Sequence, residues 1–279
     1  MMNWKKMLKA GAMVATLGLS VAVLAACSST SSSGQKTVTF ATVGTTSPYS
    51  YKKGDKLTGF DIEVARAVFK DSKEYKVDFQ QVQWSGMLTG IKSGKYNMGG
   101  NNISYTEERA KTYLYSNPIG NNPLVMVVPK DSSITKYADI AGKKTQVVQG
   151  TTTAALLENY NKEHASDPVS LNYTQEDITQ MLQHVNAGQY DFKIFDKISV
   201  ERIVKEQKLD NVKLIDLSSA DSSDIASNTY IYFIFNTDDK DLKAFVDKRI
   251  KELYEDGTLA KLSQEYLGGD YVPAKADIK

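Results

Sequence analysis

"WSGMLTGIKSGKYNMGGNNISYTEERAK", residues 84–111, carries the strongest indication of the fold. Apolar residues recur at helical spacing within residues 84–94, and Gly94 follows them as a C-cap, which predicts a helix. Residues 96–101 then predict a short buried strand, and this strand leads into a polar turn that carries Arg109. A helix, a strand and a polar turn in this order are typical of an α/β fold, in which ligands bind beyond the carboxyl ends of strands.

The same alternation continues along the chain in both directions. Predicted strands cover residues 37–43, 75–83, 124–130, 144–150, 190–196, 211–217 and 229–236. Predicted helices cover residues 59–70, 152–164, 174–188, 198–207, 239–257 and 258–268. Strands separated by helices predict an α/β fold with mostly parallel sheets that are covered on both faces. The strand–helix units cluster in residues 37–101 and 144–217, which suggests two similar lobes.

Composition excludes several classes of function. The 279 residues are 41% apolar and 24% charged, as in ordinary soluble domains, and their net charge is +1. A chain so close to neutral shows no basic surface for nucleic acid or for an anionic membrane. One cysteine and two histidines can build neither a disulfide framework nor a zinc cluster, so no metal and no cofactor are expected.

The N-terminus predicts export rather than fold. Residues 1–9 carry three lysines and no acid, and residues 10–26 are small and apolar, so residues 1–26 are expected to be a signal peptide. A transmembrane anchor is the alternative, although an apolar run of about 17 residues is marginal for spanning a bilayer. The run ends in Leu-Ala-Ala-Cys27, which resembles the bacterial lipoprotein signal and implies lipidation of Cys27, including palmitate. Residues 27–35 would then be a flexible Ser-rich tether.

Four segments, in this order, resemble one protein family. They are "SPYSYKKGDKLTGFDIEVARAV" (47–68), with its Gly59-Phe60-Asp61 step, and the segments 84–118, 138–159 and 186–204. The chain from about residue 37 to 268 resembles the polar amino-acid branch of the extracytoplasmic solute-binding proteins of ABC transporters. This branch is bacterial solute-binding protein family 3, with the type 2 periplasmic-binding-protein fold.

The resemblance implies two α/β lobes, joined by two crossing strands, with the ligand in the cleft between them. Lobe 1 would consist of residues 36–122 and 230–270, and lobe 2 of residues 123–229. The crossing strands would start near Asn122 and Tyr230. Residues 271–279 would form a tail.

A free amino acid places two demands on such a cleft. Both of its charges lose water when the cleft closes, so each must be paired. A guanidinium suits the carboxylate, since its rigid fork donates two parallel hydrogen bonds. The resemblance implies that Arg109 is this clamp, whereas in isolation it would be a solvated helix arginine. Thr151 and Thr152 are expected to complete the carboxylate site at a helix start, although a plain N-cap would use the same threonines.

The α-ammonium needs an acid from the opposite lobe. The resemblance implies Asp196, which ends a predicted strand; an N-cap of the helix that follows is the competing interpretation. Asn102 and Ser104 are expected to help as acceptors, and turn chemistry would also explain both residues.

The side chain of the ligand is expected to face Trp84, together with Tyr49 and Thr46 from the first loop. The alternative for Trp84 is a partly buried core ring at the start of a helix.

Two positions depart from the family pattern. Thr46 stands where many relatives have an aromatic residue, and Lys193 stands where relatives tend to be apolar. No acid stands at residues 45–47, which favours a neutral polar ligand, and the asparagine pair 101–102 is reminiscent of the cystine-binding subgroup.

These residues predict the binding component of an ABC importer. It would be a lipid-anchored monomer on the extracytoplasmic face of a bacterial membrane, with a Gram-positive source favoured. It would capture an amino acid, neutral polar or cystine, by cleft closure and deliver it to a membrane permease with a cytoplasmic ATPase. A surface adhesin or sensor on the same fold is one alternative. A cyclohexadienyl-dehydratase-like enzyme is another, but no nucleophile–base pair supports it. His164 and His184 are expected to be solvated and away from the cleft.

Overall fold

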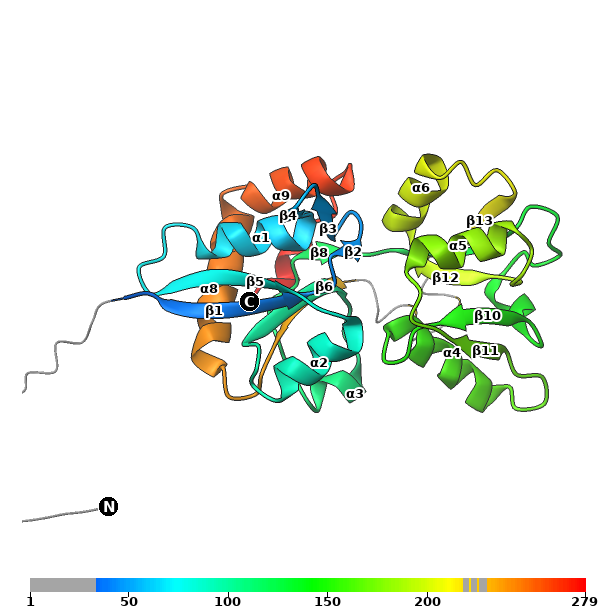
Figure 1. Ribbon diagram of the computed structural model, residues 1–279, viewed down its shortest axis with the longest axis horizontal. Helices are drawn as coiled ribbons and strands as arrows, with labels where there is room; N and C mark the ends of the chain where they lie inside the picture. Colours follow the sequence, from blue (N-terminus) through cyan, green and yellow to red (C-terminus); the bar gives the residue numbers. More distant parts are fainter. Residues whose placement is uncertain (1–33, 218–220, 222–224, 226–229) are drawn as a thin grey trace, which may run out of the picture. The chain divides into compact units, whose positions relative to one another are not determined.

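The computed structural model describes residues 34–217, 221, 225 and 230–279 (Figure 1). The predicted signal peptide (1–26), the lipidation site Cys27 and all but the last two residues of the tether lie outside the described residues. In the part of the chain that is described, no helix is both long and apolar enough to cross a membrane.

The first lobe is built on a six-stranded sheet in the order β5-β1-β6-β14-β7, with β8 paired to β14. The strands are β1 (Lys36–Thr42), β5 (Tyr75–Gln81), β6 (Met98–Ile103), β7 (Leu114–Tyr115), β8 (Gly120–Asn121) and β14 (Tyr230–Phe235). Strand β1 is parallel to β5 and β6, whereas β14 is antiparallel to β6, β7 and β8. The chain therefore leaves this sheet after β8 and returns to it with β14.

Helices cover both faces of this sheet. Successive side chains of a strand point to opposite faces, so apolar neighbours such as Phe40 and Ala41 are buried on opposite sides. The helices are α1 (Phe60–Phe69), α2 (Trp84–Lys92), α3 (Glu107–Ala110), α8 (Lys240–Glu255) and α9 (Thr258–Leu262). Phe40 of β1 joins the apolar core formed with α1, α8 and α9, while its neighbour Ala41 joins the core formed with α2. Helices α1 and α2 accordingly lie on opposite sides of the sheet (Figure 1).

The second lobe is organised around β9, a buried apolar strand. Its strands are β9 (Leu124–Pro129), β10 (Lys144–Val147), β11 (Ser170–Tyr173), β12 (Lys193–Asp196) and β13 (Val212–Asp216). Its helices are α4 (Thr152–Glu163), α5 (Ile178–Asn186) and α6 (Lys197–Glu206), with a 3-10 turn at Tyr137–Ile140. Val125 and Val127 pack against α5 and α6, and Met126 and Val128 pack in the core that includes α4. A strand covered on both faces reads as a continuous apolar run, as β9 does.

The prediction of mostly parallel sheets is wrong for this lobe. Strand β9 is antiparallel to both neighbours, β12 and β13, although β10 and β11 are parallel. The reason is that β9 carries the chain away from the first lobe and β12 brings it back. Asp196, the last residue of β12, therefore pairs with Leu124, the first residue of β9.

Four local features of the structure also differ from the sequence expectations. The helix expected to begin at residue 174 begins at Ile178, because Asp177 and Gln180 form a reciprocal capping box. The helix expected over residues 258–268 is α9 followed by a π-helical turn at Ser263–Leu267. A small antiparallel sheet formed by β2 (Thr45–Thr46), β3 (Ser50–Lys53) and β4 (Lys56–Thr58) was not expected. A 3-10 turn at Lys275–Asp277 lies in the segment expected to be a tail.

Candidate functional site

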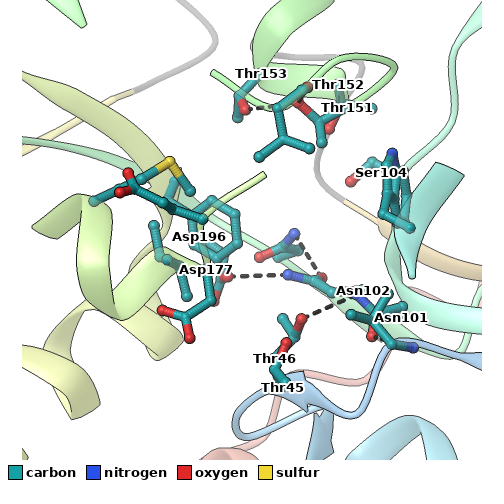
Figure 2. A pocket seen from close by; sticks show the side chains of 18 of the residues that line it. Thr45, Thr46, Asn101, Asn102, Ser104, Thr151, Thr152, Thr153, Asp177 and Asp196 are labelled. Carbon is teal, nitrogen blue, oxygen red and sulfur yellow. Dashed lines mark hydrogen bonds between the residues drawn. The ribbon is translucent and has the colours of Figure 1, made fainter. Parts of the chain in front are cut away.

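A pocket of about 150 Å³ is lined by residues of both lobes (Figure 2). Eight of the nine side chains predicted to bind the ligand line it: Thr46, Trp84, Asn102, Ser104, Arg109, Thr151, Thr152 and Asp196. The ninth, Tyr49, is fully buried and is not among the lining residues.

Arg109 is a buried cation held by main-chain carbonyls. Thr106 is the N-cap of helix α3, and its hydroxyl accepts a hydrogen bond from the Arg109 amide at 3.0 Å. The guanidinium, 8% exposed, donates to the Ser104 carbonyl at 2.7 Å and to the Gly150 carbonyl of the second lobe at 2.9 Å. Within the described residues no carboxylate forms an ion pair with it. A buried positive charge without a protein counter-ion favours an anionic ligand group.

The start of helix α4 lies on the second-lobe side of the pocket (Figure 2). Thr151 is its N-cap: the hydroxyl accepts from the Ala154 amide at 3.2 Å and donates to the Val148 carbonyl at 2.8 Å. The capping interpretation therefore describes Thr151. Thr152 and Thr153 follow in the first turn, where main-chain amides have no intrahelical acceptor and an anion is favoured.

Asp196 is both a helix cap and a pocket acid. One carboxylate oxygen accepts from the Ser199 amide at 2.8 Å and from the Tyr49 hydroxyl at 3.0 Å, and the other accepts from the Asn102 side-chain amide at 3.0 Å. Burial raises the pKa of Asp196 to about 6, against the opposing effect of these hydrogen bonds. Burial and the neighbouring Asp196 raise the pKa of Tyr49 well above its ordinary value, so its hydroxyl keeps its proton and donates.

Asn102 connects the pocket to the chain crossing between the lobes. Its backbone has φ of 54°, and its amide donates to the buried carboxylate of Asp61 at 2.7 Å. Its side chain donates to Asp196 and accepts from the amide of Asn122 at 2.9 Å. Burial raises the pKa of Asp61 to about 7, which the Asn102 hydrogen bond partly offsets. The first lobe, the crossing and the second lobe thus meet in one hydrogen-bonded group.

Thr46, Trp84 and Lys193 differ in their contacts and in their position relative to the pocket. Thr46 accepts a hydrogen bond from the Asn101 side chain at 3.0 Å. Trp84 is the first residue of α2, and the Arg109 guanidinium lies 5.7 Å from the centre of the Trp84 ring. The indole nitrogen of Trp84 is buried and has no hydrogen-bond partner among the described residues. Lys193 is buried beside the pocket rather than lining it, donates to the Gln146 carbonyl at 3.0 Å, and has its pKa lowered by burial to about 8.

Sequence reasoning missed the part of the pocket that precedes helix α5. The lining residues without a predicted role include Thr45, Thr153, Gln175, Glu176, Asp177, Met181 and Phe195. The one sequence signal for this part of the pocket was the Asp177–Gln180 spacing of a capping box, which predicts that the loop ends and the helix begins at Asp177. The other contacts depend on how α5 packs on β9 and β12, which no local motif encodes.

His164 is exposed and away from the pocket, as expected, whereas His184 is partly buried rather than solvated. His164 stacks on Tyr160, with ring centroids 3.9 Å apart, and does not line the pocket. His184 is half-buried and hydrogen-bonds the Gln146 side chain at 2.8 Å. No group of three or more His, Cys, Asp or Glu side chains that could hold a metal ion occurs in the described part of the chain.

A pocket between two α/β lobes, with a buried cation on one lobe and a buried acid on the other, defines a solute-binding protein. The chain matches the bacterial extracellular solute-binding proteins, family 3, over residues 38–269, and it belongs to this family.

Relatives of known sequence and structure agree with this class. The L-cystine-binding protein TcyA of Bacillus subtilis is 32% identical over 84% of this chain and 82% of its own length. A solved structure from work on glutathione import through GshT and the cystine ABC importer TcyBC of Streptococcus mutans is 58% identical. It has a TM-score of 0.82 and covers 87% of this chain and 99% of its own. An ancestral arginine-binding protein bound to arginine shares the fold, with a TM-score of 0.73 at 24% identity, 84% of this chain and 99% of its own.

These relatives confirm the two-lobed fold and the predicted role. The chain is a substrate-binding protein of an amino-acid ABC importer, not an enzyme.

Proposed function

We propose that this protein captures a ligand with an α-amino-acid head group and delivers it to a membrane permease that is driven by a cytoplasmic ATPase. The observation that carries the proposal is that buried Arg109 of the first lobe and buried Asp196 of the second lobe line one pocket. The guanidinium would bind the α-carboxylate with the amides of the α4 first turn, and Asp196 would bind the α-ammonium. Asn102 and Ser104 would complete the head-group site.

Both charges of the head group would then be paired inside a water-poor pocket, which is the condition for burying a zwitterion. The site fits this task because Arg109 donates to the neutral Ser104 and Gly150 carbonyls and has no carboxylate partner among the described residues. Tyr49 would act from behind the pocket by orienting Asp196.

The ligand proposed first is a sulfur compound with this head group, cystine or the γ-glutamyl peptide glutathione. Support comes from the relatives, whose names and subjects are cystine binding and the import of glutathione and cystine. A neutral polar amino acid, which the absence of an acid at residues 45–47 favoured, is the alternative ligand of the same site.

The cellular setting is proposed on the sequence. Cleavage before Cys27 and its lipidation would tether a monomer, through residues 27–35, to the outer face of the membrane of a Gram-positive bacterium. Residues 36–122 with 230–270, and residues 123–229, would be the two lobes that close on the ligand.

A thermal-shift screen of the purified protein tests the proposal. The probes are the common amino acids, cystine, oxidised and reduced glutathione, and non-amino-acid solutes such as sugars. A specific ligand raises the melting temperature by mass action, and 100-fold excess over Kd contributes about 2.7 kcal/mol. We expect a shift with at least one compound that carries a free α-amino-acid head. Shifts with sugars alone, or with none of these compounds, would refute the proposal.

A further inference from the structure

The pocket holds an acid that the amino-acid head group does not use. Glu176 lies between β11 and α5, lines the pocket, and has a side chain that is 35% exposed. Its neighbour Asp177 also lines the pocket, but one of its oxygens accepts the Gln180 amide in the cap of α5. Arg109 is the one cation among the lining residues of the described pocket. Once Arg109 and Asp196 are paired by the head group, the rest of the pocket is therefore acidic.

The orientation of Glu176 is fixed from behind by a directional chain of hydrogen bonds. The Gln146 side-chain amide donates to Oε2 of Glu176 at 2.7 Å. The oxygen of the same amide therefore faces Nδ1 of His184 at 2.8 Å, and Nδ1 must donate to it. With Oε2 directed at Gln146 and 3.5 Å from His184 Nδ1, the other oxygen, Oε1, is the one left for a ligand.

Gln146 is itself held at both ends. It is 7% exposed on β10, and its main-chain carbonyl accepts from the buried amine of Lys193 at 3.0 Å. A buried glutamine with its carbonyl and both ends of its amide engaged has little freedom to turn. The carboxylate that depends on it is therefore presented in one orientation, which is what selective recognition requires.

We propose that Glu176 determines the specificity of the proposed amino-acid site by accepting a hydrogen bond from an N–H group, amine or amide, on the distal part of the ligand. A distal amine gains a charge-assisted hydrogen bond there, and a distal carboxylate meets a like charge. Cystine offers a second ammonium, and glutathione offers the N–H of its γ-peptide bond. Each also carries a distal carboxylate, which has to point away from Glu176 for this hydrogen bond to form. His184 and Gln146 are positioning residues that act through Glu176.

Three cysteine derivatives with one head group and different distal ends test this inference, which rests on the proposed function. They are S-(2-aminoethyl)cysteine, S-carboxymethylcysteine and S-methylcysteine, measured by isothermal titration calorimetry alongside cystine and glutathione. In the natural protein we expect the aminoethyl compound to bind at least about tenfold more tightly than the carboxymethyl compound. Glu176→Gln is expected to bring this ratio to about one and to leave the affinity for S-methylcysteine within about twofold.

Matched variants separate this role from a structural one. Glu158→Gln removes another second-lobe carboxylate, one that accepts the Tyr173 hydroxyl and lies outside this pocket, and should leave the ratio unchanged. His184→Gln should lower the ratio as Glu176→Gln does, and His164→Gln should not.

An unchanged ratio in Glu176→Gln, or an equal loss for all three derivatives, overturns the inference while S-methylcysteine binding upholds the proposed function. Absence of binding by all five of these compounds overturns the inference, and only absence of binding by every amino-acid compound of the thermal-shift screen as well overturns the proposed function.

Discussion

Arg109 makes a contact between the lobes and is expected to bind the ligand, and a single substitution changes both. It donates to the Gly150 carbonyl of the second lobe and is expected to clamp the ligand carboxylate. Arg109→Ala should therefore abolish measurable binding, because an unpaired buried carboxylate costs about 2–5 kcal/mol. Calorimetric titration with the best ligand of the screen measures the loss, and Arg109→Lys, which keeps the charge but not the fork, should retain only part of the affinity. Binding of Arg109→Ala at the natural affinity would remove Arg109 from the site.

Asp196 makes ligand affinity depend on pH. Its pKa is raised to about 6 in the free protein, while an ammonium pairs only with the ionised form. Binding must therefore release a proton below this pH, and affinity should fall about tenfold for each pH unit well below 6 and level off above it. Titration between pH 4.5 and 8 in buffers of different ionisation enthalpy detects both effects. An affinity that is flat across this range would mean that no ammonium is bound by Asp196.

At the scale of elements, the Gly59-Phe60-Asp61 step at the start of α1 contacts both the first loop and the end of β6. Gly59 has φ of 117°, and a Cβ there would lie 2.4 Å from the Tyr49 carbonyl, so another side chain would displace the loop. The Asp61 amide donates to the same carbonyl at 3.0 Å, and the Asp61 carboxylate accepts from Asn102. The start of α1 thus fixes both the first loop and the end of β6.

Asp61→Asn tests how the buried Asp61 carboxylate affects the stability of the fold. The folded-state pKa of Asp61, about 7, exceeds its ordinary value of 3.8, so the folded protein holds the proton that the unfolded chain releases. The contribution of Asp61 to stability therefore declines as pH rises from about 4 to about 7 and is constant above. Asn can still accept from Asn102 without a charge, so the variant should gain stability relative to the natural protein between pH 5 and pH 8. Urea unfolding at the two pH values measures the difference; a gain that is equal at both would contradict a buried charge.

How far the sequence predicts the fold differs from one element to the next. The alternation of strands and helices placed β1, α1, α2 and α4 within two residues of their observed bounds, since their apolar periodicity is strong. The direction of β12 beside β9 was missed because pairing is a long-range property that periodicity does not encode. Arg109 could be predicted as a pocket residue from its segment. Glu176 could not, because Gln146 and His184, which orient it, come from distant parts of the sequence.

At the scale of the whole molecule, the lobes contact each other through hydrogen bonds made by the protein itself. The hydroxyl of Ser199 in α6 donates to the Ser47 carbonyl of the first lobe at 2.8 Å, and Tyr49 and Asn102 reach Asp196 in the same region. A ligand that binds the lobes in this arrangement binds more tightly when hydrogen bonds within the protein already stabilise the arrangement before the ligand arrives.

Ser199→Ala should therefore weaken binding without touching the ligand. Loss of one hydrogen bond of about 0.5–1.5 kcal/mol predicts an affinity lower by about 2- to 10-fold. The loss should be the same for every ligand, in contrast to Glu176→Gln, and small-angle scattering of the free variant should show a larger radius of gyration. Unchanged affinity and scattering would show that the Ser199 contact does not bias closure.

The hydrogen-bond capacity of Asp196 sets a limit on its ligands. A carboxylate offers about four lone-pair positions, and the Ser199 amide, the Tyr49 hydroxyl and the Asn102 amide fill three of them. One position is left for a ligand nitrogen, so a primary ammonium must place its other hydrogens on carbonyl or hydroxyl oxygens elsewhere in the pocket. Acylation of that nitrogen removes its charge and leaves a single hydrogen to share. Asp196 is therefore expected to favour free amino acids over N-acylated ones, because only the free ones bring a positive charge to the buried carboxylate.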